Sequence, residues 1–313
     1  MDVIAAISDT AIPVVLDPTR EAFMKKLETR RSEIESWPSR TFRYGSTDRH
    51  QLDVYYPDHK KVSGNSVPVL FFEYGGGFVS GDRKIDQPYD LGYANVGVFF
   101  AQRGILTVIA DYRLAPAVQF PDPVADIRDA IAWFIANTSA VASGKLPENV
   151  DLSKIFVMAH SAGATHVMSL YLSPSILPLD SPVRAATRGL IPQGGAFKFE
   201  FGGPPVLPPG LLEGYYGSKE AALANMPLTL LENAPEKLVA GLPEVFVLAS
   251  ENEPEFIKAA VDEFVKKLET RRGRVVKYEI MKGHNHISPH WALLSGEGED
   301  WAEAVAEWVK SIV

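Results

Sequence analysis

The feature that most constrains this sequence is a serine at an abrupt change of pattern. An apolar run over residues 154–158 leads into Ala159-His160-Ser161-Ala162-Gly163, and a helix-like segment covers residues 162–171. A tight strand-to-helix turn lifts the serine hydroxyl clear of a sheet. It also leaves the N–H of Ala162 at a helix start, where an anionic oxygen can be held. The other interpretation is a serine that caps a buried helix. On these residues alone both remain open.

Composition excludes several classes of partner. The chain has 313 residues, 46% of them hydrophobic and 22% charged, which is typical of a globular protein with a large core. Its net charge of −8 argues against a nucleic acid or an anionic membrane as partner. It has no cysteine, so disulfides and thiolate metal sites are excluded. No apolar run reaches the length of a membrane span, and no secretory signal begins the chain, so we expect a cytoplasmic protein without stable membrane insertion. The oligomeric state stays open.

Strand-like and helix-like segments alternate along most of the chain. This alternation predicts an α/β fold with a mostly parallel central sheet and helices on both faces. Functional groups of such folds gather at the carboxyl ends of the strands. The expected strands are residues 41–44, 51–56, 67–72, 105–110, 154–158, 188–191, 244–249 and 275–281, and the expected helices are residues 18–35, 87–102, 121–137, 162–171, 256–272 and 300–313.

One long segment, residues 199–242, interrupts the alternation. Its glycine and proline clusters at residues 202–205 and 208–210 are incompatible with the interior of a helix or strand. Long ordered insertions of this kind are often lids, so we expect a cap that places Tyr215 and Tyr216 near a pocket. A plain surface excursion is the alternative.

Serine, acid and histidine follow one another in chain order, each after an expected strand. A serine hydroxyl needs a base within hydrogen-bond reach, and the base needs a carboxylate to orient it. His284 and His286 follow the last strand. These two also suggest a metal pair, but no third ligand accompanies them, so we expect neither a metal nor a cofactor. The acid candidates are Glu251, Glu253 and Glu255. Pro254 disfavours a helical backbone at the residue before it, which suits Glu253 for a strand-end turn.

Two further groups of residues bear on the site. The run Gly75-Gly76-Gly77 follows an apolar strand, and its N–H groups can approach an oxyanion without interference from side chains. His50, His59 and His290 lie in polar sequence contexts, so we expect them at the surface.

Several motifs together resemble the hormone-sensitive-lipase-like carboxylesterases of the α/β-hydrolase superfamily. They are Tyr74-Gly75-Gly76-Gly77-Phe78, Asp111-Tyr112-Arg113-Leu114-Ala115-Pro116, Phe120-Pro121, the serine turn and Gly283-His284-Asn285-His286. The resemblance implies an α/β-hydrolase fold that cleaves small carboxylic esters through an acyl-enzyme.

The resemblance also assigns roles to individual residues. It makes Ser161 the nucleophile, His286 the base and Glu253 the acid, with Glu251 as the rival acid. Oxyanion N–H groups would come from Gly76, Gly77 and Ala162, and the substrate would lie near Tyr74, Phe78, His160, Tyr215 and Tyr216. The implied domains are a core at 46–198 and 243–313, and a cap formed by 1–45 and 199–242.

The sequence departs from this family at two places. Tyr74 stands where the family has histidine, and the serine turn reads Ala-His-Ser-Ala-Gly instead of Gly-Asp-Ser-Ala-Gly. The His-Ser-Ala-Gly-Ala turn is similar to that of kynurenine formamidases, so an arylformamidase is the alternative activity. Plant gibberellin receptors look like this family but lack the catalytic histidine, which makes a non-catalytic binder of a small ligand the third possibility.

Overall fold

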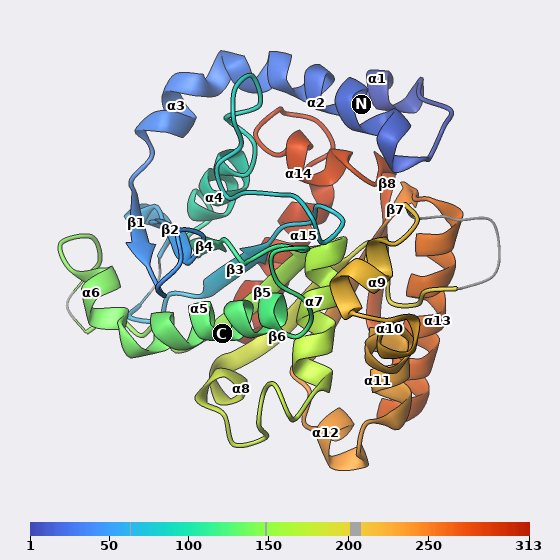
Figure 1. Cartoon of the computed structure of the whole chain (residues 1–313). Helices are drawn as coiled ribbons and strands as arrows, with labels where there is room; N and C mark the ends of the chain where they lie inside the picture. The colour runs from blue at the N-terminus through green and yellow to red at the C-terminus, as the bar shows by residue number, and fades with distance from the viewer. Residues whose placement is uncertain (63, 148, 201–207) are drawn as a thin grey trace.

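A computed structural model of the chain describes residues 1–62, 64–147, 149–200 and 208–313. One sheet runs through these residues in the order β1-β2-β4-β3-β5-β6-β7-β8 (Figure 1). Its strands are β1 (Ser39–Arg43), β2 (Gln51–Tyr55), β3 (Val69–Glu73), β4 (Leu106–Ala110), β5 (Ile155–His160), β6 (Thr187–Gln193), β7 (Glu244–Asn252) and β8 (Lys277–Asn285). Strand β2 pairs antiparallel with both β1 and β4, and every other neighbouring pair is parallel. The expectation of a mostly parallel sheet is therefore confirmed.

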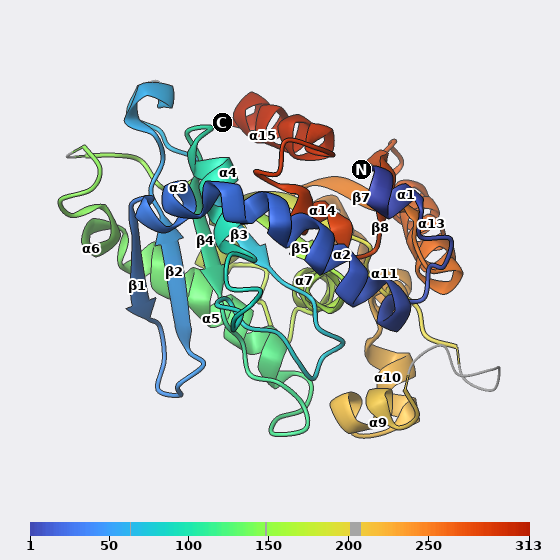
Figure 2. The same cartoon turned by 90° about the horizontal axis from the view of Figure 1, so that it is seen from above.

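Helices cover both faces of the sheet, as Figure 2 shows for α15 on one side and α5 on the other. Phe71 of β3 packs on Phe134 of α5, whereas Phe156 of β5 and Phe246 of β7 contact Trp308 of α15. The longer helices are α2 (Ile12–Leu27), α4 (Ala94–Ala101), α5 (Asp122–Ala136), α7 (Ala162–Leu172), α13 (Glu255–Arg272) and α15 (Asp300–Ile312). In the described ranges, no helix is long and apolar enough to cross a membrane.

Shorter helices occupy the N-terminal part, the connections and the insertion. They are α1 (Asp2–Ala5), η1 (Glu28–Arg30), α3 (Arg31–Ser36), η2 (His59–Lys61), α6 (Thr138–Ala142), α8 (Pro182–Ala186), α9 (Leu211–Tyr216), α10 (Lys219–Asn225), α11 (Pro227–Asn233), α12 (Glu236–Ala240) and α14 (Ser288–Ala292). Residues 202–205 of the expected cap lie outside the described residues. Helix α11 packs against both α7 and α13, α10 contacts α9 and α11, and α12 packs on α13 at the lower end of the view in Figure 1.

Two helix starts differ from expectation. Helix α2 begins at Ile12, with Pro13 in its first turn, where the missing N–H of proline costs no intrahelical hydrogen bond. Pro18 lies inside the helix. Helix α4 begins only at Ala94, because Tyr93 has a φ of 66° and the residues before it form turns. Helix α13 begins at Glu255, directly after Pro254, as expected.

Strand β3 ends in a buried carboxyl group, that of Glu73, without a hydrogen-bond partner among the described residues. Glu73 is fully buried, and neither of its carboxylate oxygens has a hydrogen-bond partner among the described residues. Burial, together with the charge of Asp111, raises the pKa of Glu73 well above its ordinary value. Burying such a group costs several kcal/mol in the charged form, so the neutral acid is favoured.

This burial predicts a pH-dependent stability that Glu73→Gln removes. The folded protein binds the Glu73 proton more tightly than the unfolded chain does. Wild-type stability should therefore fall as pH rises from the ordinary carboxyl range, by at most about 1.4 kcal/mol per pH unit, while the variant lacks this loss. Urea unfolding at about pH 4.5, 6 and 8 measures the difference. Parallel curves for the two proteins would contradict the prediction.

Candidate active site

Ser161 sits between β5 and α7 in a backbone conformation that L-residues rarely adopt. Its φ is 53° and its ψ is −121°. The Ser161 N–H donates to the carbonyl of Gln193 at 2.9 Å, which fixes the turn to β6. A Cβ added to Gly163 would lie 2.3 Å from the backbone carbonyl oxygen of Glu73 and 2.5 Å from that of Tyr74. Position 163 therefore requires glycine. Strained backbone held by close packing is common at functional sites.

Ser161, His286 and Glu253 are hydrogen-bonded in series. Ser161 Oγ lies 2.9 Å from His286 Nε2, and His286 Nδ1 lies 2.6 Å from Glu253 Oε2. The other carboxylate oxygen of Glu253 accepts from the Ser250 N–H at 3.1 Å. The side chains of Glu253 and His286 are each 1% exposed. With the proton of a neutral imidazole on Nδ1, facing Glu253, the lone pair of Nε2 faces the serine hydroxyl.

The rival residues make other contacts. The carboxylate of Glu251 accepts from the Gly283 N–H at 2.8 Å and from Lys282 Nζ at 3.1 Å at the surface. His284 Nδ1 lies 2.8 Å from Ser288 Oγ, and Nε2 donates to the Gly298 carbonyl at 2.9 Å. Burial lowers the pKa of His284 to about 4. Neither residue joins the series that contains Ser161.

The glycine run and the start of α7 present free donors. Within the described part of the chain, the N–H groups of Gly76, Gly77 and Ala162 donate to no protein acceptor. Gly76 has a φ of 138°, and a Cβ there would lie 2.0 Å from the Ser80 oxygen, so only glycine fits. Unpaired N–H groups beside a serine hydroxyl are suited to hold an oxyanion.

Two of the expected substrate-pocket residues, Tyr74 and His160, are buried and hydrogen-bonded inside the fold. Tyr74 is fully buried, and its hydroxyl donates to Asp111 Oδ1 at 2.7 Å. His160 donates from Nε2 to the carbonyl of His286 at 2.8 Å. Burial and the neighbouring histidines His290 and His286 lower the pKa of His160 well below its ordinary value, so this imidazole is neutral.

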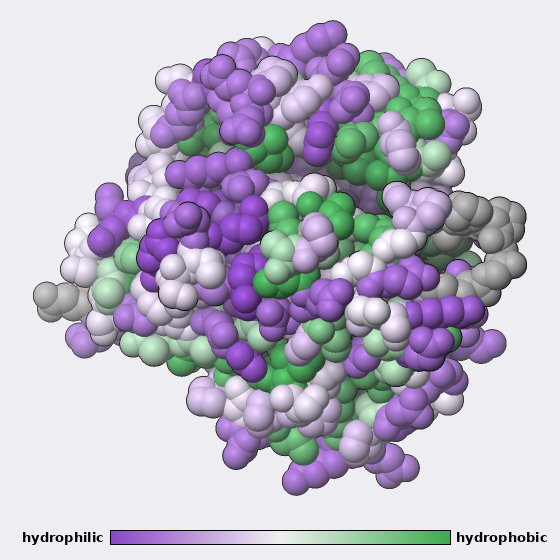
Figure 3. Space-filling view, in the orientation of Figure 1, coloured by the Kyte–Doolittle hydropathy of each residue, from purple (hydrophilic) through white to green (hydrophobic). Residues whose placement is uncertain are grey.

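An aromatic cluster separate from the main core adjoins the serine turn. Phe78 stacks on Tyr215 with ring centroids 4.5 Å apart, and Tyr215 contacts Tyr216 at 4.6 Å. The cluster also holds Ala115, Ala162, Ala196, Phe199, Leu212, Ala222 and Met226. Figure 3 shows apolar side chains in the middle of this face of the molecule and again at the upper right, over the N-terminal helices. The described part of the insertion thus packs directly against the turn that carries Ser161.

Sequence reasoning missed two residues that adjoin the series. Gly194 follows β6 with a φ of 51°, and a Cβ there would lie 2.6 Å from Glu253 Oε1. The glycine pair at 194–195, at the end of an expected strand, was the available signal. His290 is buried, and its ring lies 4.5 Å from that of His160, so its expected place at the surface is wrong. Residues 288–292 form α14, which packs under α2. His50 is partly buried, and the side chain of His59 lies outside the described residues.

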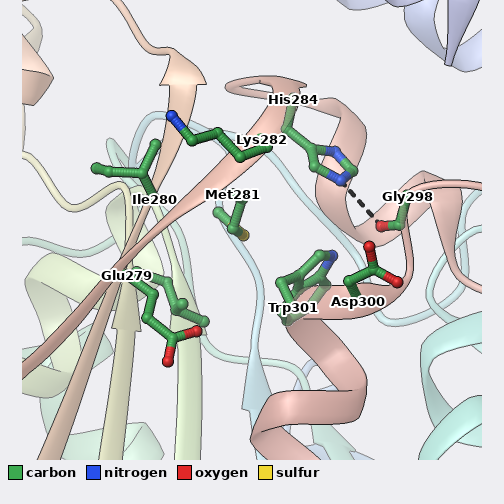
Figure 4. A pocket seen from close by; sticks show the side chains of 9 residues that line it. Glu279, Ile280, Met281, Lys282, His284, Gly298, Asp300 and Trp301 are labelled. Carbon is green, nitrogen blue, oxygen red and sulfur yellow. Dashed lines mark hydrogen bonds between the residues drawn. The ribbon is translucent and has the colours of Figure 1, made fainter.

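Metal ligands and a cavity are two further features that bear on where a site can lie. No group of three or more histidine or acidic residues that could hold a metal occurs in the described ranges. A cavity of about 180 Å³ lies between β8 and the start of α15, and Figure 4 shows Trp301 and Asp300 facing residues of β8 across it. Its lining is Leu248, Glu279, Ile280, Met281, Lys282, His284, Gly298, Asp300 and Trp301. None of the hydrogen-bonded series lines this cavity.

Sequence comparisons with known proteins match part of the chain. The family model BD-FAE matches residues 52–174. A non-reducing polyketide synthase of Stereocaulon alpinum is 31% identical over 112 residues, which are 36% of this chain and 4% of that protein. The "Probable isoprenylcysteine alpha-carbonyl methylesterase ICME" of Oryza sativa subsp. japonica is 35% identical over 122 residues, or 39% of this chain and 25% of that protein. The chain thus spans only a small part of these relatives.

The solved structure of an esterase from Pyrobaculum calidifontis superposes with a TM-score of 0.69 at 18% identity, covering 100% of this chain and 98% of that one. The chain has the α/β-hydrolase fold. At this identity the likeness extends to the fold alone.

The acid can be tested with a matched pair of variants. Glu253→Gln should lower kcat for an activated ester by about a thousand-fold or more, because the amide no longer stabilises a protonated His286. Glu251→Gln, two residues away and exposed, should change kcat little. Steady-state kinetics and thermal unfolding of both variants give the answer. The opposite ranking would move the acid to Glu251.

Proposed function

We propose that this chain is a serine hydrolase that cleaves small carboxylic esters through an acyl-enzyme. The observation that carries the proposal is the series Ser161–His286–Glu253, joined by hydrogen bonds of 2.9 and 2.6 Å. The fold, and its likeness to the solved esterase of Pyrobaculum calidifontis, support it. Membership of the hormone-sensitive-lipase-like family is part of the same proposal.

The proposed reaction has two halves. Ser161 Oγ attacks the ester carbonyl carbon while His286 Nε2 accepts the hydroxyl proton. The N–H groups of Gly76, Gly77 and Ala162 hold the oxyanion, and the intermediate collapses as His286 returns the proton to the departing alcohol. A water then attacks the acyl-enzyme with His286 again as base, which releases the acid and restores Ser161. Glu253 holds the imidazole through Nδ1 and stabilises its charged form.

The proposed cap consists of residues 1–45 and 199–242. Its support is the aromatic cluster, in which Tyr215 and Tyr216 of α9 meet Phe78 and Ala162 beside the serine. Tyr215 also binds the body of the fold, because its hydroxyl lies 2.9 Å from His166 Nδ1 and its carbonyl accepts from the Phe120 N–H at 2.8 Å. This apolar wall suits an uncharged substrate with an apolar acyl or alcohol group.

The nucleophile is tested by covalent labelling. A fluorophosphonate probe should label the wild-type protein, and Ser161→Ala should abolish both labelling and ester turnover, with a loss of about a million-fold in kcat. Intact-protein mass spectrometry and 4-nitrophenyl acetate hydrolysis measure the two effects. Absence of labelling in well-folded wild-type protein would favour a ligand-binding protein. Faster turnover of N-formylkynurenine than of any simple ester would favour the arylformamidase.

The cap is tested by substrate preference. Tyr216→Ala should change kcat/KM for 4-nitrophenyl benzoate by about fivefold or more, since removal of one apolar contact is worth about 1–3 kcal/mol, while the value for the acetate stays within about twofold. Leu223→Ala, an exposed position on α10, is the matched control. An equal loss for both esters would show that Tyr216 is only structural.

A further inference from the structure

The glycine loop, residues 74–81, carries two of the proposed oxyanion donors, and few hydrogen bonds within the loop fix its conformation. It leaves β3 at Tyr74 and ends at Gly81. Within it, the N–H groups of Val79 and Ser80 donate to the Gly76 carbonyl at 3.3 and 3.0 Å. Oxyanion stabilisation depends on donors fixed to within a few tenths of an ångström, so something outside the loop has to set its position.

Arg49 reaches this loop from the connection between β1 and β2. Its Nη2 donates to the Tyr74 hydroxyl at 2.8 Å and to the Gly81 carbonyl at 2.8 Å. Its Nε donates to the Tyr112 carbonyl at 2.7 Å, just beyond β4. One guanidinium therefore ties the first and last residues of the loop to each other and to the sheet.

Tyr74 connects Arg49 to the backbone of the loop. Its hydroxyl accepts from Arg49 and donates to Asp111, whose carboxylate also accepts from the Arg83 N–H at 2.6 Å. The Tyr74 ring stacks on Tyr112 with centroids 5.0 Å apart. The Tyr112 hydroxyl in turn donates to the Tyr74 carbonyl at 2.7 Å, at the residue before the glycine run.

We propose that Arg49 is a positioning residue that sets the placement of the Gly76 and Gly77 N–H groups by holding Tyr74 and Gly81. The inference rests on the proposed function, since it concerns the oxyanion donors of that reaction. Arg49 touches no substrate and acts only through the loop. Its planar guanidinium donates to acceptors in two directions at once, whereas a lysine ammonium on a single flexible stem does not. Misplaced donors weaken the transition state more than the bound ester, so the effect belongs in kcat.

The decisive variant is Arg49→Lys, which keeps a positive charge near Asp82, whose Oδ2 lies 3.4 Å from Arg49 Nη1, but loses the planar set of donors. We expect kcat for 4-nitrophenyl acetate to fall about ten- to a hundred-fold with KM within about twofold. The inhibition constant of a trifluoromethyl ketone, which forms the tetrahedral adduct with Ser161, should rise by the same factor as kcat/KM falls. Tyr74→Phe keeps the ring stack but removes the hydroxyl, and it should give a smaller loss of the same kind.

Arg184→Lys is the matched control. Arg184 also donates to backbone carbonyls, those of Leu177, Pro178 and Tyr171, but it lies away from the glycine loop. This variant should lower the melting temperature without changing kcat or ketone affinity. If Arg49→Lys behaves like Arg184→Lys, or raises KM alone, the inference is overturned. If Arg49→Lys does not fold, unchanged kcat and ketone affinity in Tyr74→Phe overturn it. A wild-type protein that neither hydrolyses esters nor reacts with fluorophosphonate overturns the proposed function itself, and this inference with it.

Discussion

The close contact between the start of α7 and the end of β3 organises the site. Gly163 lies so near the carbonyls of Glu73 and Tyr74 that no side chain fits between them. This approach brings the serine turn against the strand that leads into the glycine loop. The unusual backbone of Ser161 is therefore held from both sides, by β3 through Gly163 and by β6 through Gln193. The hydroxyl, the free N–H groups and the histidine can meet only because this one crossing is tight.

Electrostatics distinguishes one imidazole from its neighbours. The rings of His286, His160 and His290 form a row, with centroids 4.7 and 4.5 Å apart. Burial lowers the pKa of His290 to about 3 and that of His160 well below its ordinary value, so both are uncharged near neutral pH. Among the described residues, Glu253 is the carboxylate that reaches this row, and it bonds to His286. In this row, the imidazole that faces Ser161 is thus the one with a carboxylate partner.

Local patterns predicted the sheet and the chain order of serine, acid and histidine, because strand periodicity and turn chemistry act within a few residues. Proline positions misled the helix starts: Pro18 lies inside α2, whereas Pro88 lies in the turns that precede α4 and does not begin that helix. The burial of His290 depends on ring contacts with Phe72, His160 and Trp301, which lie far from it in the sequence or on other elements and which no local pattern contains. The contact of Arg49 with Tyr74 likewise joins residues from two different connections. Such contacts depend on tertiary packing, and local patterns in a single sequence do not predict them.

Three costly features of this structure lie at one edge of the sheet. Ser161 and Phe78 both have positive φ, and Glu73 is a buried carboxyl without a partner among the described residues. Each of these is less stable than an ordinary residue in an ordinary conformation at the same place. All three lie at the carboxyl ends of β3 and β5 or in the loops that follow them. Positive φ also occurs at Tyr93, Asn149 and Leu294, but at this edge it coincides with the hydrogen-bonded series of Ser161, His286 and Glu253. Strained backbone held by close packing is common at functional sites. Strained backbone and the hydrogen-bonded series thus occur together at the carboxyl ends of β3 and β5.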